Sequence, residues 1–329
     1  MQSFLDPAIL FFVFGLLAGA VRSNLEIPPA ISRFLSLYLL MALGLKGGFA
    51  LAKSGLTAEV ALGLGCAMLL AVVVPTLGWF WLKRRLNGFD AAALAATYGS
   101  VSAVTFITAT QHLSQQGVAF GGHMAAAMAL MESPAIVMAV LLATLVRRRQ
   151  GTAAAAVGGG GAAQHTGLRQ VLHEALTDGA QLLLIGAMVV GLLTGESGER
   201  AMQPFTGELF KGMLAFFLLD MGLLAARNAP ALRGLPASLL GYAVLGPLLH
   251  ASLALGLAVL VGLQAGDAAL LMVLAASASY IAVPAVLREA IPEARPTLYF
   301  GLSLGMTFPF NILLGIPLYT AVARQVLGG

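Results

Sequence analysis

Two short Ser-x-Ser segments place hydroxyl groups at matching positions in the two halves of the chain. Gly99-Ser100-Val101-Ser102 and Ala276-Ser277-Ala278-Ser279 each lie in the middle of an apolar run. Small and hydroxyl-bearing residues weaken a helix, and Pro284 adds to this effect after the second segment. A helix broken in this way presents free N–H groups and a positive dipole end, which attract an anion. The hydroxyl oxygens are also suitable ligands for a hard cation such as sodium.

The two segments and three residues in other apolar runs form the candidate ion sites. Glu132 is an acidic residue inside an apolar run, where a charge is costly enough to suggest a function as cation ligand or proton carrier. The alternatives are that Glu132 is structural and that the small residues only allow close helix packing. The predicted anion site comprises Ser100, Val101, Ser102, Ala103, Thr105, Ser277, Ala278, Ser279 and Tyr280. The predicted sodium ligands are Ser102, Thr105, Glu132, Ser279, Thr307 and Asn311.

Lys46 and Asp220 are charged residues in the second apolar run of each half. Opposite charges at equivalent positions predict a structural ion pair between the halves. A direct role of Lys46 as counter-charge for a transported anion, and separate solvated positions, are the alternatives.

Several other functions are disfavoured by what the sequence contains. One cysteine, Cys66, and five scattered histidines give no zinc or iron–sulfur pattern, and no nucleophile motif occurs. The sequence therefore does not predict an enzyme. The net charge of +4 comes from basic residues in short loops and does not indicate nucleic-acid binding.

The composition identifies the elements that must position these residues as membrane-spanning helices. Of 329 residues, 59% are hydrophobic and 10% are charged, and the mean hydropathy is +0.91. A bilayer-spanning helix needs about 20 apolar residues. Ten apolar runs are long enough or nearly so: 6–21, 30–52, 58–82, 89–112, 119–146, 172–194, 204–226, 235–263, 267–290 and 297–323.

The ten runs divide into two copies of a five-span unit. Landmarks return about 177 residues later, for example Asp90-Ala91-Ala92 as Asp267-Ala268-Ala269. We therefore predict a first repeat at 1–146, a flexible linker at 147–169 and a second repeat at 170–329. Because five is odd, the second copy must enter the membrane inverted, with the fourth and ninth spans broken. The bias of Arg and Lys predicts both termini periplasmic and the linker cytoplasmic, in a bacterial inner membrane.

At these residues the chain resembles the sodium-dependent bicarbonate transporter family. The resemblance covers nearly the whole chain and rests on the order and spacing of several segments. These are Leu43 to Gly48, Gly99 to Ser102 with Thr105, Met131 to Ala135, Ala276 to Ser279, and Ile291-Pro292 leading to Thr307 and Pro309.

The resemblance implies sodium-dependent uptake of bicarbonate by alternating access, with sodium as the co-transported ion. It further implies a core domain of spans three to five and eight to ten, a gate domain of the other four, a homotrimer, and inhibition by a cytoplasmic PII-like partner. The family's serine run continues with an acidic residue, where this chain has Tyr280 and Ile281. That departure favours one alternative, a symporter of another small or organic anion. A non-transporting anion sensor is the other.

Overall fold

The chain folds as helices in a computed structural model that describes residues 6–55, 57–155 and 179–328, and no strand occurs in these ranges. The N-terminal half contains α1 (Pro7–Ala20), α2 (Pro29–Ser54), α3 (Ala58–Leu82), α4 (Gly88–Gly99), α5 (Ala103–Gln115) and α6 (His123–Ala155). The C-terminal half contains α8 (Gly179–Gln203), α9 (Leu209–Asn228), α10 (Ala237–Val261), α11 (Ala265–Ala276), α12 (Ala282–Ala290), α13 (Pro296–Leu302), α14 (Phe308–Phe310) and α15 (Ile316–Leu327). Short π or 3-10 turns join α8 to α9 (η2, Pro204–Glu208), follow α9 (η3, Ala229–Leu232) and connect α13 to α15 (η4, Ser303–Thr307; η5, Asn311–Gly315).

Seven of the described stretches, rather than ten, are long and apolar enough to cross a membrane on their own: 29–53, 58–82, 88–115, 123–147, 182–232, 237–261 and 296–327. The difference has three causes. Helix α1 has only 14 residues, fewer than the roughly 20 that a span needs. The run 267–290 is divided between α11 and α12, and α8 and α9 form one stretch that bends at Gly195, where φ is 54°.

The predicted linker is helical at its beginning. Helix α6 continues to Ala155, so the first nine residues of the region 147–169 extend this helix. The rest of that region lies outside the described residues, as does the start of the predicted span 172–194. The described part of that span begins at Gly179.

Both predicted helix breaks are present. Helix α4 ends at Gly99 and α5 begins at Ala103, and Ser100 and Ser102 between them have extended backbone angles. Helix α11 ends at Ala276, and α12 begins at Ala282. Gly99 is required here because a Cβ atom at this position would lie 2.6 Å from the Pro75 ring. Pro284 lies in the first turn of α12, where a missing N–H breaks no helical hydrogen bond.

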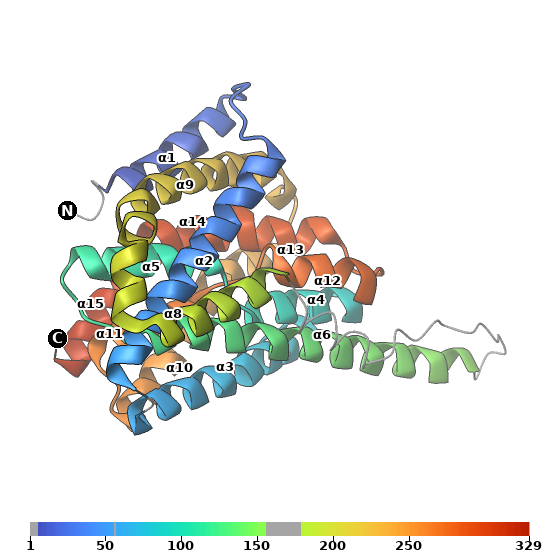
Figure 1. The fold of residues 1–329 in the computed structure, drawn as a ribbon. Coiled ribbons are helices and arrows are strands. Elements are labelled where there is room, and N and C mark those ends of the chain that lie inside the picture. The colour runs from blue at the N-terminus through green and yellow to red at the C-terminus, as the bar shows by residue number, and fades with distance from the viewer. Residues whose placement is uncertain (1–5, 56, 156–178, 329) are drawn as a thin grey trace.

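Glycines bring four helices together in two close pairs. A Cβ atom on Gly15 of α1 would lie 2.3 Å from the Leu219 carbonyl oxygen of α9, and one on Gly48 of α2 would lie 2.2 Å from the Met188 oxygen of α8. Small residues at such crossings are typical of membrane helix packing. We call α1, α2, α8 and α9 the gate group, and the remaining helices the core group (Figure 1).

Aspartates at the start of the broken segments connect the two halves of the core group. Asp90, in the first turn of α4, accepts a hydrogen bond of 2.8 Å from the backbone N–H of Arg295, just before α13, and another of 2.8 Å from the Arg295 Nε. Asp267, in the first turn of α11, accepts one of 2.6 Å from the Gly121 N–H, just before α6. Its other oxygen lies 3.6 Å from His123 Nε2. Each carboxylate thus holds the start of a helix from the other half.

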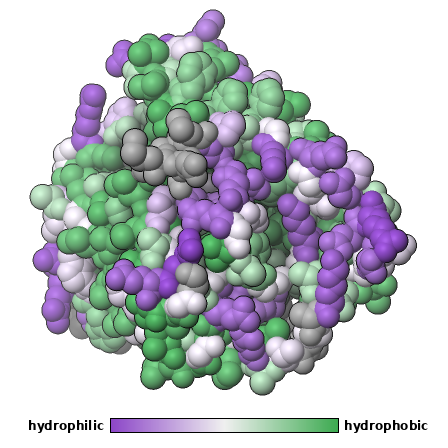
Figure 2. All heavy atoms as spheres, turned by 90° about the vertical axis from the view of Figure 1, so that its left-hand side faces the viewer, coloured by the Kyte–Doolittle hydropathy of each residue, from purple (hydrophilic) through white to green (hydrophobic). Residues whose placement is uncertain are grey.

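The surface agrees with a membrane environment. The start of α1 and the end of α15 lie at one end of the molecule, and the far end of α6 lies at the opposite end (Figure 1). Hydrophilic residues gather across the middle of the face that bears both termini, with hydrophobic residues around them (Figure 2). Large apolar side chains are exposed along the flanks of the bundle, for example Leu17, Leu193 and Leu260. Such a surface is suited to lipid contact.

Candidate functional site

The two helix breaks contact each other through direct hydrogen bonds. The backbone N–H of Ser102 donates to the Ser277 hydroxyl at 2.9 Å, and the backbone N–H of Ser279 donates to the Thr97 carbonyl at 2.8 Å. The two predicted segments therefore meet, as the sequence analysis required. Helices α5 and α12 both begin at this crossing.

Ser102 is the N-cap of α5. Its hydroxyl oxygen accepts hydrogen bonds from the Thr105 N–H at 3.2 Å and from the Thr105 hydroxyl at 2.9 Å. Side-chain caps of this type satisfy one of the otherwise unpaired N–H groups of the first turn. Ser279 has a related but longer contact of 3.3 Å with the Val283 N–H in α12. Both hydroxyls therefore sit at helix N-termini, where the helix dipole is positive.

A cavity of about 60 Å³ lies beside the crossing. We call it the break cavity. Its walls come from both helix groups, since Ser36 and Leu40 of α2 and Leu184 of α8 face the two breaks across it. The remaining lining residues are Val101, Ser102, Ala103, Val104, Met128, Glu132, Ala180, Ser279, Tyr280 and Ile281.

The break cavity brings together six of the predicted site residues: Val101, Ser102, Ala103, Glu132, Ser279 and Tyr280. Glu132 comes from α6 and is half-buried, two residues before the proline in that helix. Carboxylate and hydroxyl oxygens thus line the same small space as two helix N-termini. This arrangement could hold a sodium ion and an anion together.

Four further predicted residues support the crossing without lining the break cavity. The Ser277 hydroxyl donates to the Leu274 carbonyl while it accepts from Ser102, which uses its hydrogen-bonding capacity within the protein. Thr105 donates to Ser102. Ala278 is buried, and the Ser100 hydroxyl is buried without a hydrogen-bond partner among the described residues.

Thr307 and Asn311, two of the predicted sodium ligands, lie elsewhere in the core group. The Thr307 hydroxyl donates to the Ala243 carbonyl at 2.7 Å and contacts the Tyr98 hydroxyl at 2.6 Å. Asn311 donates to the Ala276 carbonyl at 2.8 Å and accepts from the Tyr319 hydroxyl at 3.0 Å. Asn311 therefore secures the end of α11, and neither residue lines the break cavity.

Tyr280 forms an aromatic wall of the break cavity. Its ring packs against Phe308 with the ring centroids 5.1 Å apart, and its hydroxyl is buried without a hydrogen-bond partner among the described residues. A phenol can donate to an anion but brings no negative charge. Tyr280 therefore contributes a neutral hydrogen-bonding group to this wall.

Lys46 and Asp220 do not form the predicted ion pair. The Lys46 ammonium lies 4.0 Å from the centre of the Phe210 ring. The Asp220 carboxylate interacts instead with the Ser32 hydroxyl and with the positive charge of Arg227. Helices α2 and α9 run antiparallel, so residue 46 lies near 210 and residue 32 lies near 220. Along α9, ten residues separate Asp220 from Phe210, the residue beside Lys46, which corresponds to about 15 Å.

The sequence analysis missed Ser36, which faces the breaks from α2. The available signal was a hydroxyl in an otherwise apolar part of the second span. It also missed the apolar residues that the gate group contributes, since apolar side chains carry no local sign of facing a cavity. Among the described residues, no cluster of three or more His, Cys, Asp or Glu side chains could hold a metal ion. The absence of such a cluster from these residues bears on transition metals and not on sodium, because sodium is bound mainly by hydroxyl and carbonyl oxygens.

Broken helices, a cavity between two helix groups and an apolar flank together define a polytopic membrane protein with a small internal cavity. The sequence matches the Na⁺-dependent bicarbonate transporter superfamily over residues 7–324, and the chain belongs to this family. It is therefore a transporter and not an enzyme. A comparison with curated individual proteins gave no match.

Proposed function

We propose that the protein takes up bicarbonate together with sodium by alternating access. The observation that carries the proposal is the break cavity, because gate helices form one wall and both helix breaks form the other. In this mechanism, movement of the core group against the gate group opens the cavity first to one side of the membrane and then to the other. Bicarbonate occupies the N-termini of α5 and α12, with Ser102, Ser279 and Tyr280 as hydrogen-bonding side chains.

Sodium in this proposal is bound by the oxygens of Ser102, Ser279 and Glu132, with Thr105 positioning Ser102. Thr307 and Asn311 have structural roles instead, since their polar atoms bind other parts of the protein. A cation next to the anion offsets its charge, which explains why uptake of one would require the other. The small volume of the break cavity favours a small anion over a large organic one in this conformation.

The inverted repeat is part of the proposal and is supported by the direction of helix packing. Gly15 and Gly19 of α1 face Gly222 and Ala226 of α9 in the same order, so these two helices run parallel. Gly44 and Gly48 of α2 face Ala187 and Gly191 of α8 in the same way. In two inverted five-span repeats, both contacts are between a first span of one repeat and a second span of the other.

The proposed setting is a bacterial inner membrane, with both termini periplasmic and the linker cytoplasmic. A homotrimer and a PII-like regulator follow from the family resemblance alone. Light scattering of the detergent-purified protein tests the trimer.

The decisive experiment is uptake of labelled bicarbonate into proteoliposomes at fixed pH, with and without an inward sodium gradient. Protein-free liposomes measure the diffusion of carbon dioxide. We expect uptake that saturates with bicarbonate and requires sodium. In Glu132→Gln, we expect the half-saturating sodium concentration to rise while the protein remains folded. Sodium-independent uptake, or no uptake by folded protein, contradicts the proposal.

A further inference from the structure

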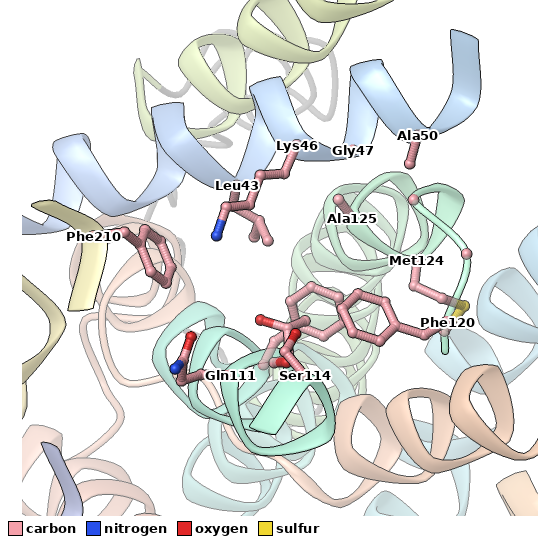
Figure 3. A pocket seen from close by; sticks show the side chains of 14 residues that line it. Leu43, Lys46, Gly47, Ala50, Gln111, Ser114, Phe120, Met124, Ala125 and Phe210 are labelled. Atoms are coloured by element: carbon pink, nitrogen blue, oxygen red, sulfur yellow. The ribbon is translucent and has the colours of Figure 1, made fainter. Parts of the chain in front are cut away.

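A second cavity, of about 100 Å³, lies between α2, α5, α6 and α9. We call it the lysine cavity because the Lys46 side chain extends from α2 toward the open space, with Gln111 and Ser114 of α5 on the opposite side (Figure 3). The rest of its wall is largely apolar and aromatic, for example Phe106, Phe120 and Phe210.

The lysine cavity carries positive charge without a matching carboxylate. No Asp or Glu oxygen among the described residues lies within 4.0 Å of the Lys46 ammonium, which contacts the Phe210 ring instead. The nearby Lys211 ammonium adds to the positive potential at Lys46. Asp267, the acid beside the cavity-lining Gly121, is already bound by the Gly121 N–H and lies next to His123. Lys46 is exposed while its neighbours from Ala42 to Phe49 are buried, so its ammonium faces the open space of the cavity, where an anion would offset its charge.

One further group at the lysine cavity is suited to an anion. The Gln111 amide makes no hydrogen bond to the described residues, so its N–H groups are available as donors. The start of α6 also lies at the cavity, directly after the lining residues Gly121 and Gly122, but the Asp267 carboxylate already accepts from the Gly121 N–H at 2.6 Å and offsets the positive end of this helix. The hydroxyls of Thr110 and Ser114 also line the cavity, but they donate to backbone carbonyls and are therefore not available as donors to a ligand.

The lysine cavity and the break cavity lie along the same seam. Leu40 of α2 and Met128 of α6 line the break cavity, while Leu43 and Met124 line the lysine cavity. Three or four helical residues correspond to a displacement of about 6 Å along each helix. The facing edges of the two cavities are thus roughly one helical turn apart.

We propose that the lysine cavity is a second binding site for a small oxyanion, on the access route from the periplasm to the break cavity. Lys46 supplies the charge, and Gln111 supplies hydrogen-bond donors. The site attracts bicarbonate before it reaches the helix breaks. This inference rests on the proposed function for its substrate and its sidedness.

A kinetic comparison tests the role of Lys46. In proteoliposomes, we expect Lys46→Gln to raise the KM for bicarbonate about tenfold, which corresponds to the loss of about 1.4 kcal/mol of binding, with little change in kcat. Lys46→Arg, which keeps the charge, should retain most of the affinity. The matched control is Lys53→Gln, which removes the same charge from the outer end of α2, where Lys53 pairs with Glu199 at 2.6 Å. An equal effect of the two Gln variants, or an unchanged KM in Lys46→Gln, overturns the proposal.

A binding assay separates this site from transport itself. In a Cys66→Ala background, Ser114→Cys places a thiol at the edge of the lysine cavity. We expect bicarbonate to slow alkylation of this thiol by a membrane-impermeant reagent, and Lys46→Gln to abolish the protection. Protection without transport would retain the site while contradicting the proposed function. Transport without protection would overturn the site alone.

Discussion

At the residue scale, the break cavity depends on hydroxyl groups that serve the fold and the proposed ligands at once. Ser102 accepts two hydrogen bonds from Thr105, so its oxygen is held in place at the start of α5. Ser277 differs, because both its donor and its acceptor capacity are used within the protein. The second serine of one Ser-x-Ser segment and the first serine of the other therefore have different roles.

Ser102→Leu should abolish uptake because a bulky apolar side chain fills a cavity of about 60 Å³ and removes the cap of α5. Loss of the cap costs about 1 kcal/mol of stability, so the protein should still fold. The measurement is sodium-driven uptake together with thermal unfolding in detergent. Ser252→Leu is the matched control, since Ser252 is exposed on α10 and should tolerate an apolar side chain facing lipid. Normal uptake by Ser102→Leu would exclude the break cavity as the transport site.

At the element scale, the broken segments are anchored at their outer ends as well as at the crossing. Asp90 and Asp267 lie at equivalent repeat positions, and each binds the backbone N–H just before a helix of the other half. These contacts hold the start of α13 and of α6 against the broken segments.

Asp90→Ala and Asp267→Ala should each destabilise the fold by about 1–3 kcal/mol, because each leaves a backbone N–H without its acceptor. Thermal unfolding measures the effect. Glu196→Ala serves as control, since Glu196 forms an exposed pair with Arg200 one turn away and such pairs contribute about 0–1 kcal/mol. Similar unfolding temperatures for all three variants would show that the two aspartates do not anchor these helices.

The loop between α12 and α13 is fastened to α6 by a titratable contact. The Arg147 guanidinium donates to both carboxylate oxygens of Glu293, at 2.9 and 2.8 Å, and these hydrogen bonds lower the pKa of Glu293. A carboxyl whose pKa is lower in the folded state stabilises the fold above its unfolded pKa. That contribution is lost as the pH falls through the lowered pKa.

We therefore expect Glu293→Gln to be slightly less stable than the wild type at pH 7, and the difference to decrease below the ordinary glutamate pKa of about 4.3 and to vanish below the lowered pKa. The effect should be modest, since the pair is partly exposed to solvent. Unfolding temperatures between pH 7 and pH 3 provide the test. A difference that persists at the acid end would mean that the charge of Glu293 is not the cause.

At the scale of the whole molecule, the sequence predicted more of the architecture than of the ion site. The helix breaks could be predicted because serine, glycine and proline act locally on helix stability, as at Gly99 and Ser277. The prediction of a Lys46–Asp220 pair was wrong, because the register between antiparallel helices depends on packing that no local pattern encodes. The position of Asn311 could not be predicted either, since only the fold shows that its amide binds the end of α11.

The helices of the gate group pack through glycines that leave little room for a side chain. Gly48→Ala should destabilise the protein by about 1–3 kcal/mol, because the new Cβ atom would lie 2.2 Å from the Met188 carbonyl oxygen and force α2 away from α8. The effect should appear in thermal unfolding and as slower uptake, since the separated helices also form a wall of the break cavity. Gly65→Ala is the matched control: Gly65 lies in α3 with no atom within 4 Å of the added Cβ, and alanine favours the helix by up to about 1 kcal/mol. If both variants behave alike, close contact between α2 and α8 does not hold the gate group together.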